Sequence, residues 1–270
     1  MPKKPIIGAT ISVTEDLDKC FDYVDRIQVN ITSSHTFNLP TVNSPFIKKF
    51  LPYKDRAPLI VHSPYTISFV HTPNDTKSVV GKNYAASLAR ISNDLGLRII
   101  YVTHLGTIPQ GMSSKTALSN IKANLRLLSP RVRDSPLFKM CFENDSGVVG
   151  RSKANTASGL LWMHLNRIGA YPWKSICLDT QHAYASGLSS DRWSSLANVA
   201  KVIHLNSIPQ HIIKGSCKDE HSKFMLKDSK EKKSIIEVIK IATEKGIPMI
   251  LERYGWDIIM EDVAFIKSVK

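Results

Sequence analysis

The sequence has few cysteines, no long hydrophobic run and no recognisable export signal. Its 270 residues include four cysteines, none at a paired spacing, which excludes a zinc-finger or disulfide framework. Cys141 and Cys177 each stand two residues before an acid, so we expect both to fill the core. No run approaches the ~18 apolar residues of a membrane span, and the start MPKKPIIGATISV lacks the apolar segment and cleavage site of a signal peptide. We therefore expect an intracellular protein without a membrane anchor.

Glycine, proline and serine do not gather into a linker. The 13 glycines and 14 prolines are spread along the chain, and 43% of the residues are hydrophobic. This is the composition of a globular protein with a sizeable core. We predict a single domain that spans residues 1–270.

Acidic residues are outnumbered by basic ones. There are 23 Asp and Glu against 36 Lys and Arg, so the net charge is +13. Such an excess favours a polyanionic partner, because each phosphate that a cation neutralises releases a bound counterion; a merely soluble basic surface is the alternative. Seven of the lysines lie close together late in the chain, at Lys214, Lys218, Lys223, Lys227, Lys230, Lys232 and Lys233. We interpret them as a phosphate-contacting loop that leads into a helix, with a solvated face as the alternative.

Short apolar runs alternate with longer amphipathic segments along almost the whole chain. The predicted strands are 5–13, 26–31, 58–62, 98–104, 137–144, 175–180, 201–206 and 247–253. The predicted helices are 16–24, 44–51, 82–96, 115–129, 154–169, 191–200, 232–246 and 257–269. Continuous apolar strands that alternate with helices indicate a parallel sheet covered by helices, and eight such units predict a (β/α)₈ TIM barrel. An open doubly wound sheet usually has a glycine-rich turn after its first strand, and GATISVTEDL has a single glycine.

Metal-capable side chains stand at the carboxyl ends of six successive predicted strands. They are His62, His104, Glu143, Asp179, His204 and Glu252. Each alone has an ordinary explanation as a turn former or a helix cap. Their repetition is harder to explain in that way, because turns favour Asn, Ser and Gly. In a TIM barrel this end carries the active site, and imidazoles mixed with carboxylates suit zinc or a similar divalent metal.

Three more candidate ligands lie in the loops that follow. His182 comes three residues after Asp179 in CLDTQHAYASG, and Asp219 and His221 occur in GSCKDEHSK. Nine candidates are more than one metal ion can use, so we predict a polynuclear site. Such a site can generate a hydroxide nucleophile and stabilise the oxygens of a phosphoryl displacement. Together with the basic charge, it favours phosphodiester hydrolysis on nucleic acid.

Five short strings resemble, in their order, the endonuclease IV family of apurinic/apyrimidinic endonucleases. They are FENDSG, CLDTQHAYASG, VIHLN, DEH and ILE. The corresponding strings of the family usually include E-N-T-x-G, C-x-D-T-C-H-x-x-A-x-G, H-x-N-D and D-R-H. The resemblance extends from about His62 to Glu252, and CLDTQHAYASG is its most specific element.

The resemblance implies the same barrel and a cluster of three zinc ions. The implied ligands are His62, His104 and Glu143 for the first zinc, Glu143, Asp179, His204 and Glu252 for the second, and His182, Asp219 and His221 for the third. Glu143 would orient the attacking hydroxide, and Glu252 could share that role. The implied reaction is cleavage of double-stranded DNA 5′ to an abasic site by a monomeric enzyme, leaving a 3′-hydroxyl.

The family flips the abasic sugar out of the helix and fills the gap with side chains. Tyr65 in HSPYTISF matches a residue that stacks in the gap, although a simple surface tyrosine is an equal alternative. The arginine that commonly enters the gap is absent from NITSSHTFN, where His35 or Phe37 could replace it.

Two departures from the family concern the third metal site and the grip on DNA. Ser207 replaces the acid of H-x-N-D, and Glu220 replaces the arginine of D-R-H. The phosphate contacts are therefore expected to come from Lys214, Lys218, Lys223 and Lys227.

Two other functions compete with the nuclease interpretation. Sugar isomerases and epimerases of the same superfamily also place Glu, Asp and His at strand ends, but they have no need of a +13 charge or of the pair Asp219 and His221. A catalytically inactive DNA-binding barrel would not need all nine candidate ligands. Metal content separates the three, since about three zinc ions are expected for the nuclease, one or two for the isomerase and none for the binding protein.

Replacing Lys214, Lys218 and Lys223 with Ala is expected to flatten the salt dependence of DNA binding. Each lost phosphate contact removes about 0.9 from the slope of log affinity against log salt. Binding titrations of both proteins over a series of salt concentrations measure the slope. An unchanged slope would mean that this loop faces solvent.

Overall fold

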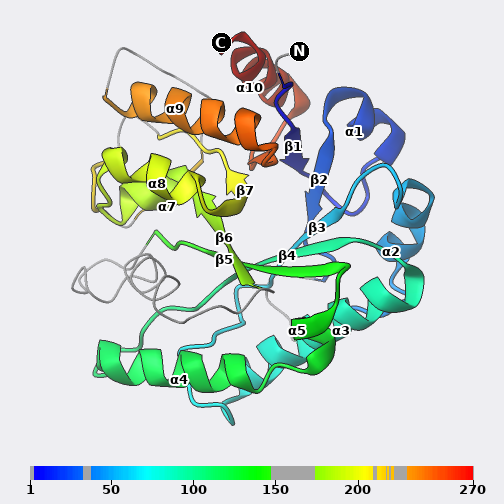
Figure 1. The fold of residues 1–270 in the computed structure, drawn as a ribbon, viewed down its shortest axis with the longest axis vertical. Helices are drawn as coiled ribbons and strands as arrows, with labels where there is room; N and C mark the ends of the chain where they lie inside the picture. The colour runs from blue at the N-terminus through cyan, green and yellow to red at the C-terminus, as the bar shows by residue number, and fades with distance from the viewer. Residues whose placement is uncertain are drawn as a thin grey trace.

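The computed structural model describes residues 3–32, 38–146, 174–208, 212–216, 218, 220–221 and 230–269. Eight strands pair in parallel, each with the next along the chain, and the eighth closes on the first. They are β1 (Ile7–Thr10), β2 (Arg26–Val29), β3 (Leu59–His62), β4 (Ile99–His104), β5 (Phe138–Glu143), β6 (Lys174–Asp179), β7 (Ala200–His204) and β8 (Met249–Leu251). The predicted (β/α)₈ TIM barrel is confirmed (Figure 1). Each strand overlaps one of the predicted runs.

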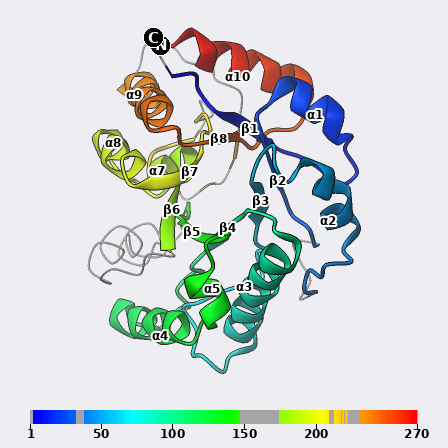
Figure 2. The same ribbon diagram turned by 45° about the vertical axis from the view of Figure 1, so that its right-hand side comes forward.

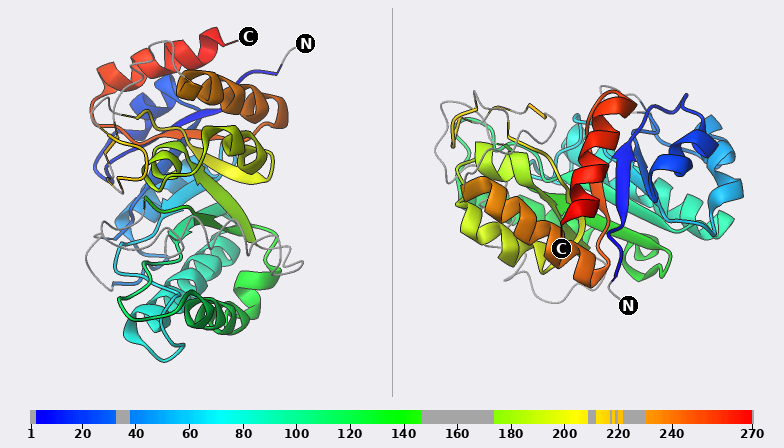
Figure 3. Two further views of the ribbon diagram at one scale, coloured as in Figure 1. Left: turned by 90° about the vertical axis from the view of Figure 1, so that its left-hand side faces the viewer. Right: turned by 90° about the horizontal axis from the view of Figure 1, so that it is seen from above.

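Helices surround the closed sheet (Figures 1 and 2). They are α1 (Leu17–Tyr23), α2 (Pro45–Phe50), α3 (Thr76–Leu95), α4 (Ser114–Arg126), α5 (Pro130–Asp134), α7 (Thr180–Ala185), α8 (Trp193–Ala197), α9 (Lys230–Lys245) and α10 (Trp256–Ser268), with the short 3₁₀ helices η1 (Leu51–Tyr53) and η3 (Ser190–Arg192). The last helix, α10, lies beside β1, where the barrel closes (Figure 3). None of the helices in the described part of the chain is long and apolar enough to cross a membrane.

Two helices, α5 and α7, form where no helix was predicted, α3 begins earlier than predicted, and one predicted helix lies outside the described residues. Helix α3 begins at Thr76 rather than at residue 82, because the Asp75 side chain accepts a hydrogen bond from the Lys77 backbone amide and caps the helix there. The segment after Asp179, predicted as a loop, forms α7. The predicted helix 154–169 falls in the part of the chain that the structure does not describe.

The core has two parts. The larger packs the outer face of the barrel against the helices, and the smaller fills the barrel interior with Ile60, Val102, Cys141, Cys177, Val202 and Ile250. Cys141 and Cys177 are therefore core fillers, as predicted, and burial raises the pKa of the Cys177 thiol to about 12. Gly8 of β1 faces the same interior, where a Cβ would lie 2.5 Å from Ile250 Cδ1. The barrel interior beneath the mouth is thus filled by side chains.

Candidate metal centre

Four imidazoles surround one buried carboxylate, that of Glu143, at the carboxyl end of the barrel. Its Oε2 lies 2.9 Å from His62 Nε2 and 3.4 Å from His104 Nε2. Its Oε1 lies 2.9 Å from His204 Nδ1 and 3.2 Å from His182 Nδ1. The Glu143 side chain is only 1% exposed. Strands β3, β4, β5 and β7 and helix α7 therefore meet at this one carboxylate.

Two further carboxylates extend the cluster toward the loop after β7. His204 Nδ1 lies 3.2 Å from Glu252 Oε2 and 3.8 Å from Asp179 Oδ2. His221 spans the same pair, with Nε2 3.8 Å from Asp179 Oδ2 and Nδ1 3.7 Å from Glu252 Oε2. The structure thus brings together eight of the nine candidate ligands, while Asp219 lies outside the described residues.

The ligand atoms form overlapping groups, and within each group they lie within 4.8 Å of one another. These groups are His62, His104 and Glu143; His62, His204 and Glu252; Glu143, Asp179, His204 and Glu252; and Asp179, His182 and His221. The first and third match the ligand sets expected for the first and second metals. The last differs from the expected third set in that Asp179 joins His182 and His221.

Strand register explains why the side chains meet. His104 is paired with Glu143 across β4 and β5, and Asp179 is paired with His204 across β6 and β7. Asp179 also caps α7, because its Oδ1 accepts a hydrogen bond of 2.7 Å from the His182 backbone amide. The same carboxylate therefore ends β6, starts α7 and fixes the position of His182.

The protonation of two histidines tests whether the site suits a cation. His62 Nδ1 lies 2.9 Å from the carbonyl oxygen of Ser63, to which it can only donate, so in the neutral ring the Nε2 lone pair faces Glu143 Oε2. His204 Nε2 likewise faces the side-chain oxygen of Gln28 at 2.9 Å, which turns its Nδ1 lone pair toward Glu143. A lone pair that faces a carboxylate at 2.9 Å requires a proton or a metal ion between the two atoms.

The pKa shifts at the centre come from burial and from the charged groups that lie around each side chain. Burial disfavours the charged carboxylate of Glu143, but the imidazoles of His204 and His104 outweigh it and hold the pKa of Glu143 well below its usual range. Burial raises the pKa of Asp179 and lowers that of His104, whose Nδ1 is buried without a hydrogen-bond partner in the described structure. Three carboxylates and an open imidazole nitrogen in so small a space fit divalent cations, which neutralise the acids and use the lone pairs.

Gln28 is a supporting residue that the sequence analysis missed. It is fully buried on β2, and its Nε2 donates to Glu252 Oε1 at 2.8 Å and to Thr10 Oγ1 at 3.1 Å. Together with its contact to His204, it therefore orients one carboxylate and one imidazole. The signal was an amide side chain in the middle of the apolar run RIQVNI.

Asn206 links two carboxylates of the cluster to a buried ion pair. Its Nδ2 donates to Asp179 Oδ2 at 2.6 Å and to Glu252 Oε2 at 3.1 Å. Its Oδ1 accepts from Arg253 Nη1 at 2.8 Å. Arg253 is in turn paired with Asp262 of α10. The position of the carboxylates thus depends on a helix outside the barrel.

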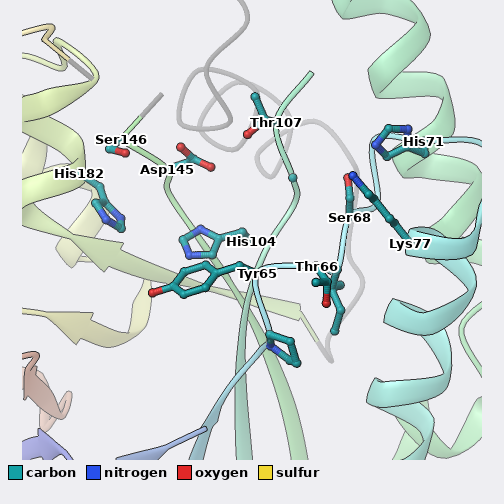
Figure 4. A pocket seen from close by; sticks show the side chains of 13 residues that line it. Tyr65, Thr66, Ser68, His71, Lys77, His104, Thr107, Asp145, Ser146 and His182 are labelled. Atoms are coloured by element: carbon teal, nitrogen blue, oxygen red, sulfur yellow. The ribbon is translucent and has the colours of Figure 1, made fainter. Parts of the chain in front are cut away.

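The residues predicted to contact DNA are only partly described. Tyr65 is 64% exposed and stacks on His104, with ring centroids 6.4 Å apart and planes 23° apart. These residues line a cavity of about 300 Å³. Figure 4 shows His104 between Tyr65 and Asp145, with Lys77 across from them. The side chains of Lys214 and Lys218 are exposed. Four other candidates, His35, Phe37, Lys223 and Lys227, lie outside the described residues.

The fold and the cluster define a TIM barrel with a candidate polynuclear metal centre at its mouth. No family model matches the chain. The chain is 27% identical to the probable endonuclease 4 of Halothermothrix orenii over an alignment of 271 positions, which covers 91% of this chain and 92% of that protein. This similarity confirms the resemblance to the endonuclease IV family.

Solved structures share the fold at lower identity. Endonuclease IV from Thermus thermophilus superposes with a TM-score of 0.68 at 20% identity, covering 98% of each chain. The AP endonuclease of African swine fever virus has a TM-score of 0.73 at 14% identity, covering 98% of this chain and 99% of that one. A D-tagatose 3-epimerase-like protein has a TM-score of 0.66 at 19% identity, covering 100% of this chain and 97% of that one. The barrel alone therefore does not separate nucleases from epimerases.

Replacing Asp262 with Ala is expected to lower the free energy of unfolding by about 3 kcal/mol, because it removes the carboxylate partner of the buried Arg253 guanidinium. Urea unfolding followed by circular dichroism measures the change. Glu244→Ala, which removes an exposed acid at the end of α9, is the control and should change stability by about 0.5 kcal/mol or less. Equal stability of the two variants would show that the pair of Arg253 and Asp262 does not stabilise the fold.

Proposed function

We propose that the protein is a zinc-dependent endonuclease that hydrolyses the DNA backbone 5′ to abasic sites and leaves a 3′-hydroxyl. The observation that carries the proposal is the series of overlapping ligand groups in which Glu143 and Asp179 are shared. The similarity to a probable endonuclease 4 over 91% of the chain supports it. We further propose that the chain acts as a monomeric single domain inside the cell, in base excision repair.

The ligand groups suggest how three zinc ions would be held. His62, His104 and Glu143 would hold the first, and Glu143, Asp179, His204 and Glu252 the second. His182 and His221, with Asp179 and the expected ligand Asp219, would hold the third. Bound zinc ions would supply a coordinated water of lowered pKa and positive charge for the phosphate oxygens.

The two candidate catalytic carboxylates differ in access. The Glu143 side chain is 1% exposed and is held by imidazoles on both oxygens, which suits a group that orients others. The Glu252 side chain is 15% exposed and lines the open mouth. We infer that Glu252 receives the proton of the attacking water, while Glu143 holds the surrounding imidazoles in position. No side-chain nucleophile is needed.

The charge of the chain supports a polyanionic substrate. The net charge of +13 includes Lys214 and Lys218, which are exposed in the loop that leads to His221. Tyr65 stands at the rim, 64% exposed, where it could fill the space left by a displaced sugar. Phosphate contacts from the lysines would therefore place the strand over the metal centre.

A sugar isomerase or epimerase is the second candidate, and the structural similarity to a D-tagatose 3-epimerase-like protein favours it. The group formed by Asp179, His182 and His221 argues for the nuclease, because it provides for a metal beyond the one or two that such an isomerase needs. The positive charge argues in the same direction, since a neutral sugar gains little from it.

Incision of a duplex oligonucleotide with a single synthetic abasic site tests the proposal. We expect one cut 5′ to the lesion, sensitive to a chelator and absent from the undamaged duplex. Elemental analysis of the purified protein should find about three zinc ions per chain. A zinc-containing protein that leaves the duplex intact but interconverts ketoses would be an epimerase.

Glu143→Gln is expected to reduce incision by more than about 100-fold, because the loss of even a residue that supports a metal ligand typically costs 10–100-fold. Affinity for abasic DNA should remain largely intact, since Glu143 is buried away from the DNA surface. Incision rates and binding titrations measure the two effects, and circular dichroism checks the fold. Undiminished activity would exclude a central role for Glu143.

A further inference from the structure

Tyr254 is the most exposed large hydrophobic residue of the described chain, at 98%. It stands between Arg253 and Gly255, in the segment that joins β8 to α10, two residues after Glu252. An aromatic ring left almost wholly in water contributes nothing to the core. Its exposure and its position at the mouth of the candidate centre therefore indicate a role in binding.

The backbone on both sides of Tyr254 is anchored. Arg253 is buried and donates hydrogen bonds to Asn206 Oδ1 at 2.8 Å and to the Leu205 carbonyl oxygen at 3.3 Å. Gly255 has φ of 92°, a conformation that favours glycine, and directly precedes α10. Trp256 then packs on Tyr23, with ring centroids 5.3 Å apart. The ring is thus exposed on an anchored backbone, so little entropy would be lost when the ring binds a ligand.

Tyr254 shares a cavity with the metal-ligand candidates. The cavity has a volume of about 670 Å³, and its lining includes His62, Glu143, Glu252, Tyr65 and Tyr254. Tyr65 follows β3 and Tyr254 follows β8, and β1 and β2 separate these strands in the barrel. Two exposed tyrosines therefore approach the same opening from different sides.

We infer that Tyr254 is a base-stacking residue that holds a nucleotide beside the abasic site, on the side of the mouth away from Tyr65. This inference rests on the proposed function. Every nucleobase has a face that stacks on an aromatic ring, so the contact would tolerate any sequence around a lesion. Because a nucleotide flanking a flipped-out sugar has lost a stacking neighbour, the ring would replace that lost contact.

Replacing Tyr254 with Ala tests the inference, and the ring's exposure makes a folding defect unexpected. We expect affinity for a duplex already nicked at the abasic site, which cannot be cut again there, to fall about 5- to 150-fold, the range that ~1–3 kcal/mol per stacked base represents. Tyr254→Phe should keep wild-type affinity, because the stacking face remains. Leu127→Ala removes a side chain that is 61% exposed just after α4, and it should bind like the wild type.

A second measurement distinguishes stacking from a general loss of affinity. With 2-aminopurine beside the abasic site, the base should fluoresce more brightly in the saturated Tyr254→Ala complex than in the wild-type or Tyr254→Phe complexes, because stacking quenches it. Equal affinity and equal fluorescence in all three would overturn the inference. So would a Tyr254→Ala protein that binds DNA normally but loses self-association in sedimentation, since the ring would then serve a protein interface.

The wild-type incision assay keeps the two proposals apart. If the wild-type protein does not cut abasic DNA, the proposed function fails whatever Tyr254 does. If it cuts and Tyr254→Ala binds the nicked duplex as tightly as the wild type, only the stacking inference fails.

Discussion

The contact of four imidazoles with the buried Glu143 carboxylate is the constraint on which the rest of the mouth depends. A carboxylate that is 1% exposed can stay ionised only if positive charge lies against it. Two of the imidazoles, His62 and His204, use their other nitrogen to donate to a fixed oxygen, so a proton or a metal ion must lie between their facing nitrogens and Glu143. Cations at the centre would satisfy these contacts, and the chain's own hydrogen bonds set where such cations would lie.

Two features of the barrel produce this geometry, the register of its strands and the apolar side chains that fill its interior. Parallel pairing puts His104 beside Glu143 and Asp179 beside His204, so the polar side chains of neighbouring strands lie in the same layer of the barrel. Below them the interior is filled by apolar side chains such as Val102 and Val202, which keep water from reaching the carboxylates from beneath. The low-dielectric floor strengthens every charge interaction in the layer above it, and this is also why an unpaired group there would be costly.

Sequence predicted the strands and the positions of the candidate ligands because both are local signals, an apolar run and the polar residue that ends it. Gln28 was missed because its role depends on Glu252 and His204, which are distant in sequence and which only barrel closure brings near. Helix α7 was missed because Asp179 was assigned to the metal and not also to the helix cap that it forms. Local patterns therefore specify which residues reach the mouth, whereas the hydrogen bonds that orient them depend on tertiary structure.

Under the proposed function, the part of the site that would distinguish a phosphodiesterase from a sugar epimerase lies beyond the strands. Strand ends alone provide the group of His62, His104 and Glu143, which a site for one or two metals could also use. The group of Asp179, His182 and His221 needs two additions, the helix that Asp179 caps and the loop after β7. Asn206 ties these additions to the barrel, because one amide bonds both Asp179 and Glu252 and is itself held by Arg253. A third metal position, and with it a preference for phosphate, would therefore arise from short segments added to a barrel that is otherwise common to both chemistries.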